Sequence, residues 1–255
     1  MYYSIDSVKK GMKKMSGHSK WNNIKRKKEK TDGERAKVFT KLGREIAVIV
    51  KMGGPDPASN ARLKDIIAKA KSNNMPNDNI QRCIKKAAGD GDADNFEDIT
   101  YEGYGPAGVA VMVKTLTDNR NRTAADMRHY FDKYGGNLGT TGCVSFMFER
   151  KGIIVVDKEN ISDEDEFTLA ALEAGALDIS DEDDCFEVIT EPEKVWEVSE
   201  ALTNAGIEAA DSEDTYVPVT TVTLTEEDQI KNMNKLIEML EDDDDVQDVY
   251  HNWEE

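Results

Sequence analysis

One change of hydrophobic period divides this chain of 255 residues. Between residues 31 and 88 the apolar residues recur at helical spacing, whereas from residue 99 onward they follow the two-residue period of strands, interrupted by helical segments. A polar, glycine-containing stretch at 89–94 separates the two patterns. The change predicts a small helical domain followed by mixed α+β structure.

Three amphipathic helices are expected in the first part, at 31–52, 56–72 and 78–88. The first begins with a Thr-x-x-Glu capping box. The second has Asp56 as its N-cap and Pro57 at the first helical position, where a missing N–H costs nothing. Because the connections between the helices are short, the three pack into one helical domain.

Strands and helices alternate after the linker. Strands are expected at 99–101, 109–116, 143–148, 152–156, 184–189, 209–216, 219–225 and 246–250, with helices at 124–134, 164–174, 193–205 and 226–240. This order predicts two small α+β sandwiches, each with helices on one face of a mostly antiparallel sheet. The segment 142–148 faintly resembles the aromatic strand of an RNA-recognition motif, but it lacks the basic residue, so a core strand is the favoured interpretation.

Charge is distributed very unevenly along the chain. The whole sequence holds 51 Asp/Glu against 33 Lys/Arg, and its net charge of −18 argues on average against a nucleic-acid partner. Residues 1–90, however, hold 22 basic and 9 acidic side chains, and residues 153–255 hold 4 basic and 33 acidic ones. A basic binding module beside an acidic one is therefore predicted, and the argument from repulsion applies only to the acidic part.

Several classes of protein are not expected from this sequence. No run approaches the ~18 apolar residues of a membrane helix, and the first residues lack the apolar core of a secretory signal. The three cysteines have no metal or disulfide spacing, which predicts buried, inert thiols and a cytoplasmic location. Because no catalytic or phosphate-loop motif is present, we expect no enzyme, cofactor, metal site or small-molecule substrate.

The strongest candidate site is a basic arm that precedes the first helix. Cationic side chains neutralise phosphates, and an aromatic ring among them can stack on a base. The residues of the arm are His18, Lys20, Trp21, Lys25, Arg26, Lys27, Lys28 and Lys30. A helical face formed by Lys37, Lys41 and Arg44 could continue the same patch. The alternative is a solvated arm with its tryptophan packed on the helical domain.

A second candidate lies at 118–123, before the helix expected at 124–134. Asn119, Arg120 and Arg122 combine amide and guanidinium groups at a helix N-terminus, where free backbone N–H groups favour anions. The alternative interpretation is an ordinary helix cap, with Arg122 paired to Asp126 at i, i+4. The sequence leaves these two interpretations open.

Several motifs resemble the YebC/PmpR family, which includes the mitochondrial translational activator of cytochrome oxidase subunit I. They are Gly17-His18-Ser19-Lys20-Trp21, the segment 39–46, Asn74-Met75-Pro76, the segment 101–106, the segment 117–123 and the segment 135–139. The resemblance implies three domains, the third inserted into the second: 15–92 helical, 93–150 with 214–255, and the acidic insert 151–213. Residues 1–14 would be an extension. By resemblance, Lys20, Lys25, Lys41 and Arg44 contact nucleic acid, and Asn119, Arg120 and Arg122 also lie in a matching motif.

The resemblance also implies a function. Family members are described as DNA-binding transcriptional regulators, and some as ribosome-associated translation factors that ease the synthesis of difficult sequences such as proline runs; no catalytic activity or cofactor belongs to the family. We therefore predict a non-enzymatic, monomeric, nucleic-acid-binding regulator of gene expression. The alternative partner is ribosomal or transfer RNA.

Two other interpretations involve the acidic part of the chain. The acidic residues 153–213 could bind a basic protein, which would make the chain an adaptor. They could also pair with the basic part of the same chain. There they would compete with nucleic acid, since both are polyanions.

Overall fold

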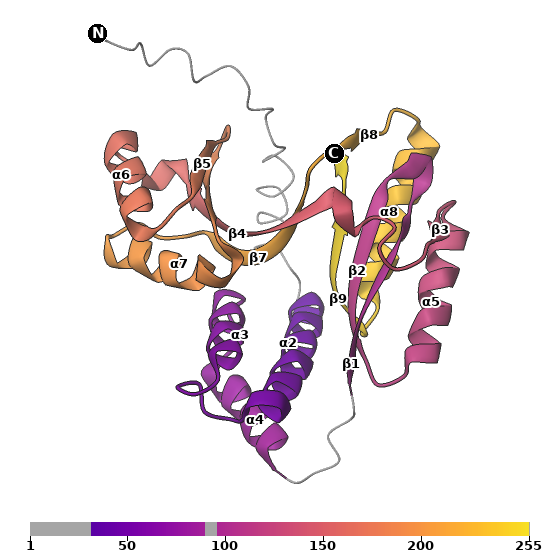
Figure 1. Ribbon diagram of the computed structural model, residues 1–255, viewed down its shortest axis with the longest axis horizontal. Coiled ribbons are helices and arrows are strands. Elements are labelled where there is room, and N and C mark those ends of the chain that lie inside the picture. Colours follow the sequence, from indigo (N-terminus) through magenta and orange to yellow (C-terminus); the bar gives the residue numbers. More distant parts are fainter. Residues whose placement is uncertain (1–31, 90–95, 255) are drawn as a thin grey trace.

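The computed structural model describes residues 32–89 and 96–254 (Figure 1). Three helices form the first domain: α2 (Asp32–Gly53), α3 (Ala61–Ser72) and α4 (Asn77–Ala88). Their apolar stripes meet in one core that contains only residues of these helices and of the short α3–α4 connection. Its buried members are Leu42, Ile46, Val50, Leu63, Ile66, Ala70, Met75, Ile80, Ile84 and Ala87. The predicted helical domain is confirmed.

The start of α3 differs from the prediction. The helix begins at Ala61 rather than next to Pro57, because Asn60 is its N-cap and accepts a hydrogen bond from the backbone N–H of Leu63. The amide nitrogen of Asn60 also donates to the carbonyls of Ile49 and Gly54, which fixes the turn after α2. Asp56 closes this turn by accepting from the backbone N–H of Ala58. An Asp-Pro pair thus marks the turn rather than the helix.

The second domain is an antiparallel sheet with strand order β3-β1-β2-β9. Its strands are β1 (Glu97–Tyr104), β2 (Ala110–Thr117), β3 (Asn137–Leu138) and β9 (Val246–His251). Helices α5 (Arg120–Lys133) and α8 (Glu227–Asp242) cover one face of the sheet. Alternate residues of β2 supply the sheet side of the core, and Phe131 and Leu236 are among the helical residues packed on it.

The third domain has the βαββαβ order of ferredoxin-like folds. Its antiparallel sheet has strand order β5-β6-β4-β7, and two helices cover one face. The elements in chain order are β4 (Phe148–Asp157), α6 (Glu164–Ala174), β5 (Asp178–Asp181), β6 (Cys185–Thr190), α7 (Val195–Asn204) and β7 (Asp211–Pro218). The multi-domain α+β class predicted from the sequence is therefore confirmed.

Two long paired strands carry the chain between the α+β domains. The chain leaves the second domain along β4 and returns along β7 before the remaining strand–helix–strand of that domain, β8 (Val222–Thr223), α8 and β9; a short β10 (Trp253–Glu254) follows and pairs with β8. The third domain is thus inserted into the second. Because the predicted boundaries at 150 and 214 fall inside β4 and β7, we propose that this ribbon is a shared bridge between the two domains.

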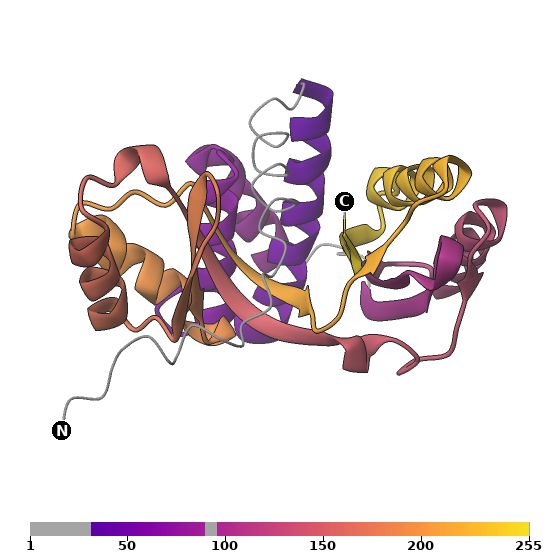
Figure 2. The ribbon, with the colours of Figure 1, turned by 90° about the horizontal axis from the view of Figure 1, so that it is seen from above.

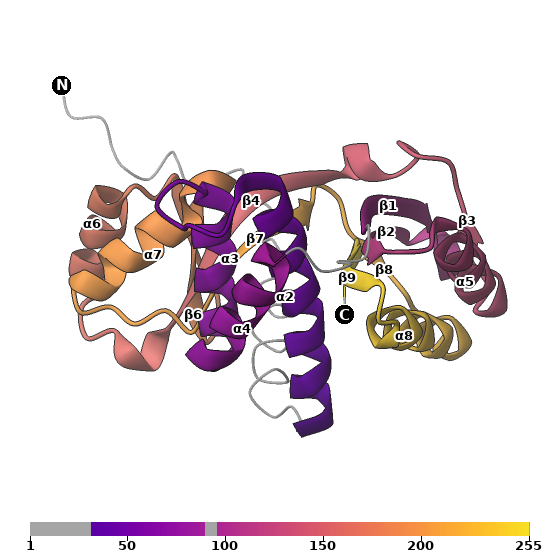
Figure 3. The ribbon, with the colours of Figure 1, turned by 90° about the horizontal axis from the view of Figure 1, so that it is seen from below.

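The three-helix domain lies between the two α+β domains, against the bridging ribbon (Figures 1 and 2). From below, α3 lies toward the third domain and α2 toward the second (Figure 3). This position brings basic helices against acidic elements, and it determines which cations of the helical domain stay open to solvent.

Two predicted strands are wrong or shorter than expected. In place of the strand expected at 143–148, the chain forms a short 3-10 helix (Ser145–Met147). Strand β4 then begins at Phe148 and runs without a break through the second expected strand, 152–156. The cause is Glu102, a buried carboxylate on β1 that accepts the backbone N–H groups of Gly142, Val144 and Ser145 and so holds them out of a sheet ladder. The strand expected at 219–225 comprises only Val222 and Thr223.

Candidate nucleic-acid interface

The predicted site residues divide into two groups. The arm residues His18, Lys20, Trp21, Lys25, Arg26, Lys27, Lys28 and Lys30 lie outside the described residues. The other six lie on α2 and at the start of α5. The structure shows what surrounds these six residues, and their surroundings differ from those of an open phosphate-binding surface.

Lys37, Lys41 and Arg44 recur every three to four residues along α2, so they share one face of the helix. That face meets the run Glu241–Asp245, called here the acidic segment, which spans the end of α8 and the turn into β9. The ammonium nitrogen of Lys37 lies 2.7 Å from Oδ1 of Asp242, and that of Lys41 donates to the carbonyl of Glu241 at 2.7 Å. The predicted phosphate-binding face is therefore occupied by carboxylates and carbonyls of the same chain.

Lys41 is half-buried at this face, as Arg44 is, whereas Lys37 is exposed. Burial lowers its pKa from the ordinary lysine value and outweighs the opposing field of Glu241, Asp248, Asp243 and Asp244. The hydrogen bond that this ammonium group donates is to the backbone carbonyl of Glu241, and the carboxylates act on it through their field.

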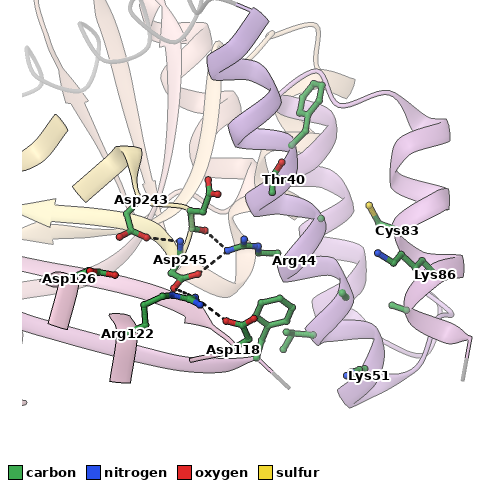
Figure 4. Close-up of a pocket in the computed structure, with 17 residues that line it drawn as sticks. Thr40, Arg44, Lys51, Cys83, Lys86, Asp118, Arg122, Asp126, Asp243 and Asp245 are labelled. Atoms are coloured by element: carbon green, nitrogen blue, oxygen red, sulfur yellow. Dashed lines mark hydrogen bonds and ion pairs between the residues drawn. The ribbon is translucent and has the colours of Figure 1, made fainter. Parts of the chain in front are cut away.

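Asp245 is a buried carboxylate that joins the helical domain to the second domain (Figure 4). Its Oδ1 accepts from Nη1 of Arg44 at 3.2 Å, and its Oδ2 accepts from Nη2 of Arg122 at 2.6 Å. The hydroxyls of Thr117 and Thr123 lie 3.0 and 2.9 Å from the same Oδ2. Four donors from α2, β2 and α5 thus converge on one side chain that is 8% exposed.

The charge of Asp245 is stabilised by these partners. Burial alone would raise its pKa, but hydrogen bonds from Arg122, Thr123 and Thr117 outweigh burial and hold the pKa below the ordinary aspartate value. In turn, the hydrogen bonds that Arg122 donates to Asp245 and Asp118 raise the pKa of Arg122 above its usual range. The carboxylate is therefore ionised at neutral pH, and in this arrangement it connects Arg44 of the helical domain to Arg122 of the second domain.

The start of α5 acts mainly as a structural cap. Asn119 is the N-cap and accepts from the backbone N–H of Arg122, as the cap interpretation predicted. The ion-pair partner of Arg122 differs from that interpretation, because Arg122 pairs with Asp118 and Asp245 instead of Asp126. Asp118 precedes the helix, and Asp245 comes from the turn before β9. Arg120 is exposed.

A cleft of about 730 Å³ lies between the helical domain and the second domain (Figure 4). Basic side chains line it from α2, α4 and α5, and five aspartates face them. The charged lining residues are Arg44, Lys51, Lys86, Arg122, Asp118, Asp126, Asp243, Asp244 and Asp245. Because both signs of charge are interleaved, the cleft is poorly suited to bind an isolated anion.

The helical domain also carries cations that were not named as site residues. Arg62, Lys64 and Lys71 on α3, with Arg82, Lys85 and Lys86 on α4, are exposed and are called here the outer cations. The polar side of each helix and the strong positive charge of residues 1–90 were the signals that could have identified them. Lys69, on the same helix as Lys71, is excluded because it pairs with Glu45 at 3.4 Å.

Among the described residues, the three thiols are further candidates for chemistry. Cys185 is buried, and burial raises its pKa to about 12, while Cys83 and Cys143 are only half-buried. Burial raises the pKa of these two as well, which keeps all three thiols protonated at neutral pH. Within residues 32–89 and 96–254, no group of His, Cys, Asp and Glu is placed to hold a metal ion, and no helix is long and apolar enough to cross a membrane.

The glycine motifs at 101–106 and 135–139 permit close packing. A Cβ on Gly103 would lie 2.6 Å from the carbonyl oxygen of Asn137 and 2.8 Å from the ring of Phe131, and one on Gly136 would collide with the carbonyl of Tyr104. These glycines let β3 and α5 approach β1. These glycines therefore allow close packing within the second domain.

Comparison with known proteins gives consistent matches along the whole described chain. Residues 19–90 match the model described as the TACO1/YebC protein N-terminal domain, and residues 96–253 match the TACO1/YebC second and third domain. A protein of Acetivibrio thermocellus named "Probable transcriptional regulatory protein" is 59% identical over 239 residues, which cover 94% of this chain and 99% of that protein. A protein of the same name from Ruminiclostridium cellulolyticum is 59% identical over 241 residues, covering 94% of this chain and 97% of that protein.

The crystal structure of a conserved hypothetical protein from Aquifex aeolicus superposes with a TM-score of 0.76 at 46% identity, covering 88% of this chain and 92% of that one.

Proposed function

The chain belongs to the TACO1/YebC family, and from this premise we propose that it is a non-catalytic regulator of gene expression that binds nucleic acid through its helical domain. The name of its relatives, "Probable transcriptional regulatory protein", supports a role in transcription and makes duplex DNA the first partner to test. Such a protein would regulate by binding to the nucleic acid and not by catalysing a reaction.

The observation that carries the proposal is the surface of α3 and α4. The outer cations are exposed on a domain whose core is complete without the rest of the chain. Exposed Lys and Arg neutralise phosphates and release counterions without reading bases. The arm residues 18–30 would add further contacts next to α2, although they lie outside the described residues.

Salt titration tests this proposal. Binding of the full chain to a fluorescent random-sequence DNA duplex is measured by anisotropy between about 50 and 200 mM salt, a range over which several phosphate contacts weaken binding by orders of magnitude. We expect a steep linear fall of log affinity with log salt. Affinity that does not change over this range would refute a backbone-binding role.

A second experiment separates the two polyanions. The same titration with an RNA of the same sequence, together with gradient fractionation of a crosslinked lysate, compares DNA with ribosomes as the partner. Duplex preference and absence from ribosomal fractions agree with a transcriptional role. RNA preference and co-sedimentation with ribosomes would replace it with a role in translation.

A further inference from the structure

The acidic segment, Glu241 to Asp245, contacts one face of α2 through the carboxylates of Asp242 and Asp245 and through the backbone carbonyls of Glu241 and Asp244. Lys37 pairs with the side chain of Asp242, and Arg44 donates to the carbonyl of Asp244 at 2.6 Å as well as to the carboxylate of Asp245. A nucleic-acid backbone offers the same chemistry, because it is a row of anionic oxygens that accept from Lys and Arg. The segment therefore occupies, with two carboxylates and two backbone carbonyls, the same donors of α2 that a phosphate backbone would use.

The interface between α2 and the acidic segment is held by charge and not by a shared apolar core. The helical core contains only residues of its own three helices and their connections, and the hydrogen bonds described between α2 and the acidic segment all come from cationic side chains. The outermost pair is solvated, since the side chains of Lys37 and Asp242 are 45% and 61% exposed. An exposed pair of this kind is weak, is screened by salt and can be exchanged for another anion, whereas Arg44 contacts a carboxylate that is only 8% exposed.

The acidic segment is also firmly attached on its other side. The carbonyl of Asp245 accepts from the backbone N–H of Leu116 at 2.7 Å, and the carboxylate of Asp243 accepts from the hydroxyl of Tyr130 at 3.1 Å. These contacts keep the segment in the second domain whether or not α2 is present. Separation would therefore occur at the α2 side, where the described hydrogen bonds all come from cationic side chains and only one of them reaches a buried carboxylate, that of Asp245.

We propose that the face of α2 formed by Lys37, Lys41 and Arg44 is a second contact surface for a nucleic-acid backbone, which the acidic segment covers in this arrangement and releases when nucleic acid binds. This inference rests on the proposed function and adds a gate to it. The outer cations make the first contact, and the three cations of α2 join only after α2 has separated from the acidic segment. Competition by the segment then lowers weak, non-specific binding.

The test neutralises the exposed carboxylates of the acidic segment and leaves Asp245 intact. Glu241→Gln, Asp242→Asn and Asp244→Asn are combined in the full chain, since all three residues are exposed. The matched control combines Glu164→Gln, Glu166→Gln and Glu173→Gln on α6, which changes the net charge equally and leaves the interface unaltered. Binding of fluorescent random-sequence DNA and RNA is measured at low salt, and small-angle scattering of the free proteins measures their dimensions.

We expect the segment variant to bind at least tenfold more tightly than the wild type and to show larger maximum dimensions, while the control changes binding by less than threefold. Equal strengthening by both triple variants would mean that only net charge matters, and it would overturn the gate. Unchanged binding by the segment variant, with a wild type that does bind, would also overturn the gate but leave the proposed function standing. If neither the wild type nor any variant binds either polyanion, the proposed function itself fails.

Discussion

The two basic surfaces of the helical domain have the same residue types but opposite surroundings. On α2, Lys37, Lys41 and Arg44 are paired with the acidic segment of the second domain. On α3 and α4, the outer cations are exposed, and of these only Lys86 also borders the cleft. The difference teaches that the charge available to a partner is determined by what the tertiary structure places opposite each helix face, and not by the density of Lys and Arg along the chain.

The largest effect is expected at the ionic connection that makes α2 different. Asp245→Asn removes the charge on which Arg44, Arg122 and two threonine hydroxyls converge. Because Arg122 keeps Asp118 and is half-exposed, we expect a loss of about 2–3 kcal/mol in the free energy of unfolding, below the range for a fully buried pair. Urea unfolding measures it, and Asp242→Asn, at an exposed position, is the control. A loss no larger than that of the control would contradict the role of Asp245.

The pH dependence sharpens the same point. The pKa of Asp245 is lowered in the folded protein, so its contribution to stability is fully present above the ordinary value of 3.8 and is lost as the pH falls through the lower folded value. The stability difference between wild type and Asp245→Asn should therefore be constant from about pH 7 to about pH 5 and shrink below about pH 4. A difference that grows on acidification would show that the charge of Asp245 is not stabilised.

Removing the open surface should weaken binding. Arg82→Gln, Lys85→Gln and Lys86→Gln together are expected to reduce affinity for the DNA duplex about tenfold or more and to make the salt slope shallower by about 2–3, since each phosphate that is no longer neutralised lowers the slope by roughly one. Lys194→Gln, Lys231→Gln and Lys235→Gln form the control, because they remove the same charge from exposed positions outside the helical domain. Equal weakening by the two triple variants would erase the distinction between the surfaces.

The smallest effect belongs to the exposed ion pair of the covered surface. A double-mutant cycle with Lys37→Ala and Asp242→Ala should give a coupling energy of less than about 1 kcal/mol that decreases with salt, as is usual for exposed pairs. Coupling of more than about 2 kcal/mol, or coupling insensitive to salt, would show a rigid interface that nucleic acid does not readily displace.

Much of the fold could be predicted from the sequence, because local signals determine it. The 3.6-residue apolar pattern predicted each end of α2 and α4 to within one residue. The alternation of strands and helices predicted the two α+β domains. The failures have long-range or capping causes. Buried Glu102 prevents a strand at 143–148, and Asn60 replaces Asp56 as the cap of α3.

The candidate site was predicted less well, for a physical reason. The spacing of Lys37, Lys41 and Arg44 correctly places them on one face of α2, but their partners lie 200 or more residues away in sequence. No local pattern identifies which acidic run will face a basic helix. The sequence suggested 153–213 as the competitor of the basic part, whereas the run in contact with this face of α2 is 241–245, from the second domain.

Lysine acylation followed by mass spectrometry tests the central claim most directly, since it compares the two surfaces in one sample. In the free wild type at low salt, Lys85 should react rapidly because it is exposed. Lys41 should react slowly because its half-buried nitrogen is held by the carbonyl of Glu241, and this loss of access is expected to outweigh the larger fraction of neutral amine that its lowered pKa gives. In the variant with Glu241→Gln, Asp242→Asn and Asp244→Asn, Lys41 should become reactive and should be protected again when nucleic acid is added. If Lys41 reacts as fast as Lys85 in the wild type, or stays unreactive in the variant, the account of a covered and an open surface is wrong.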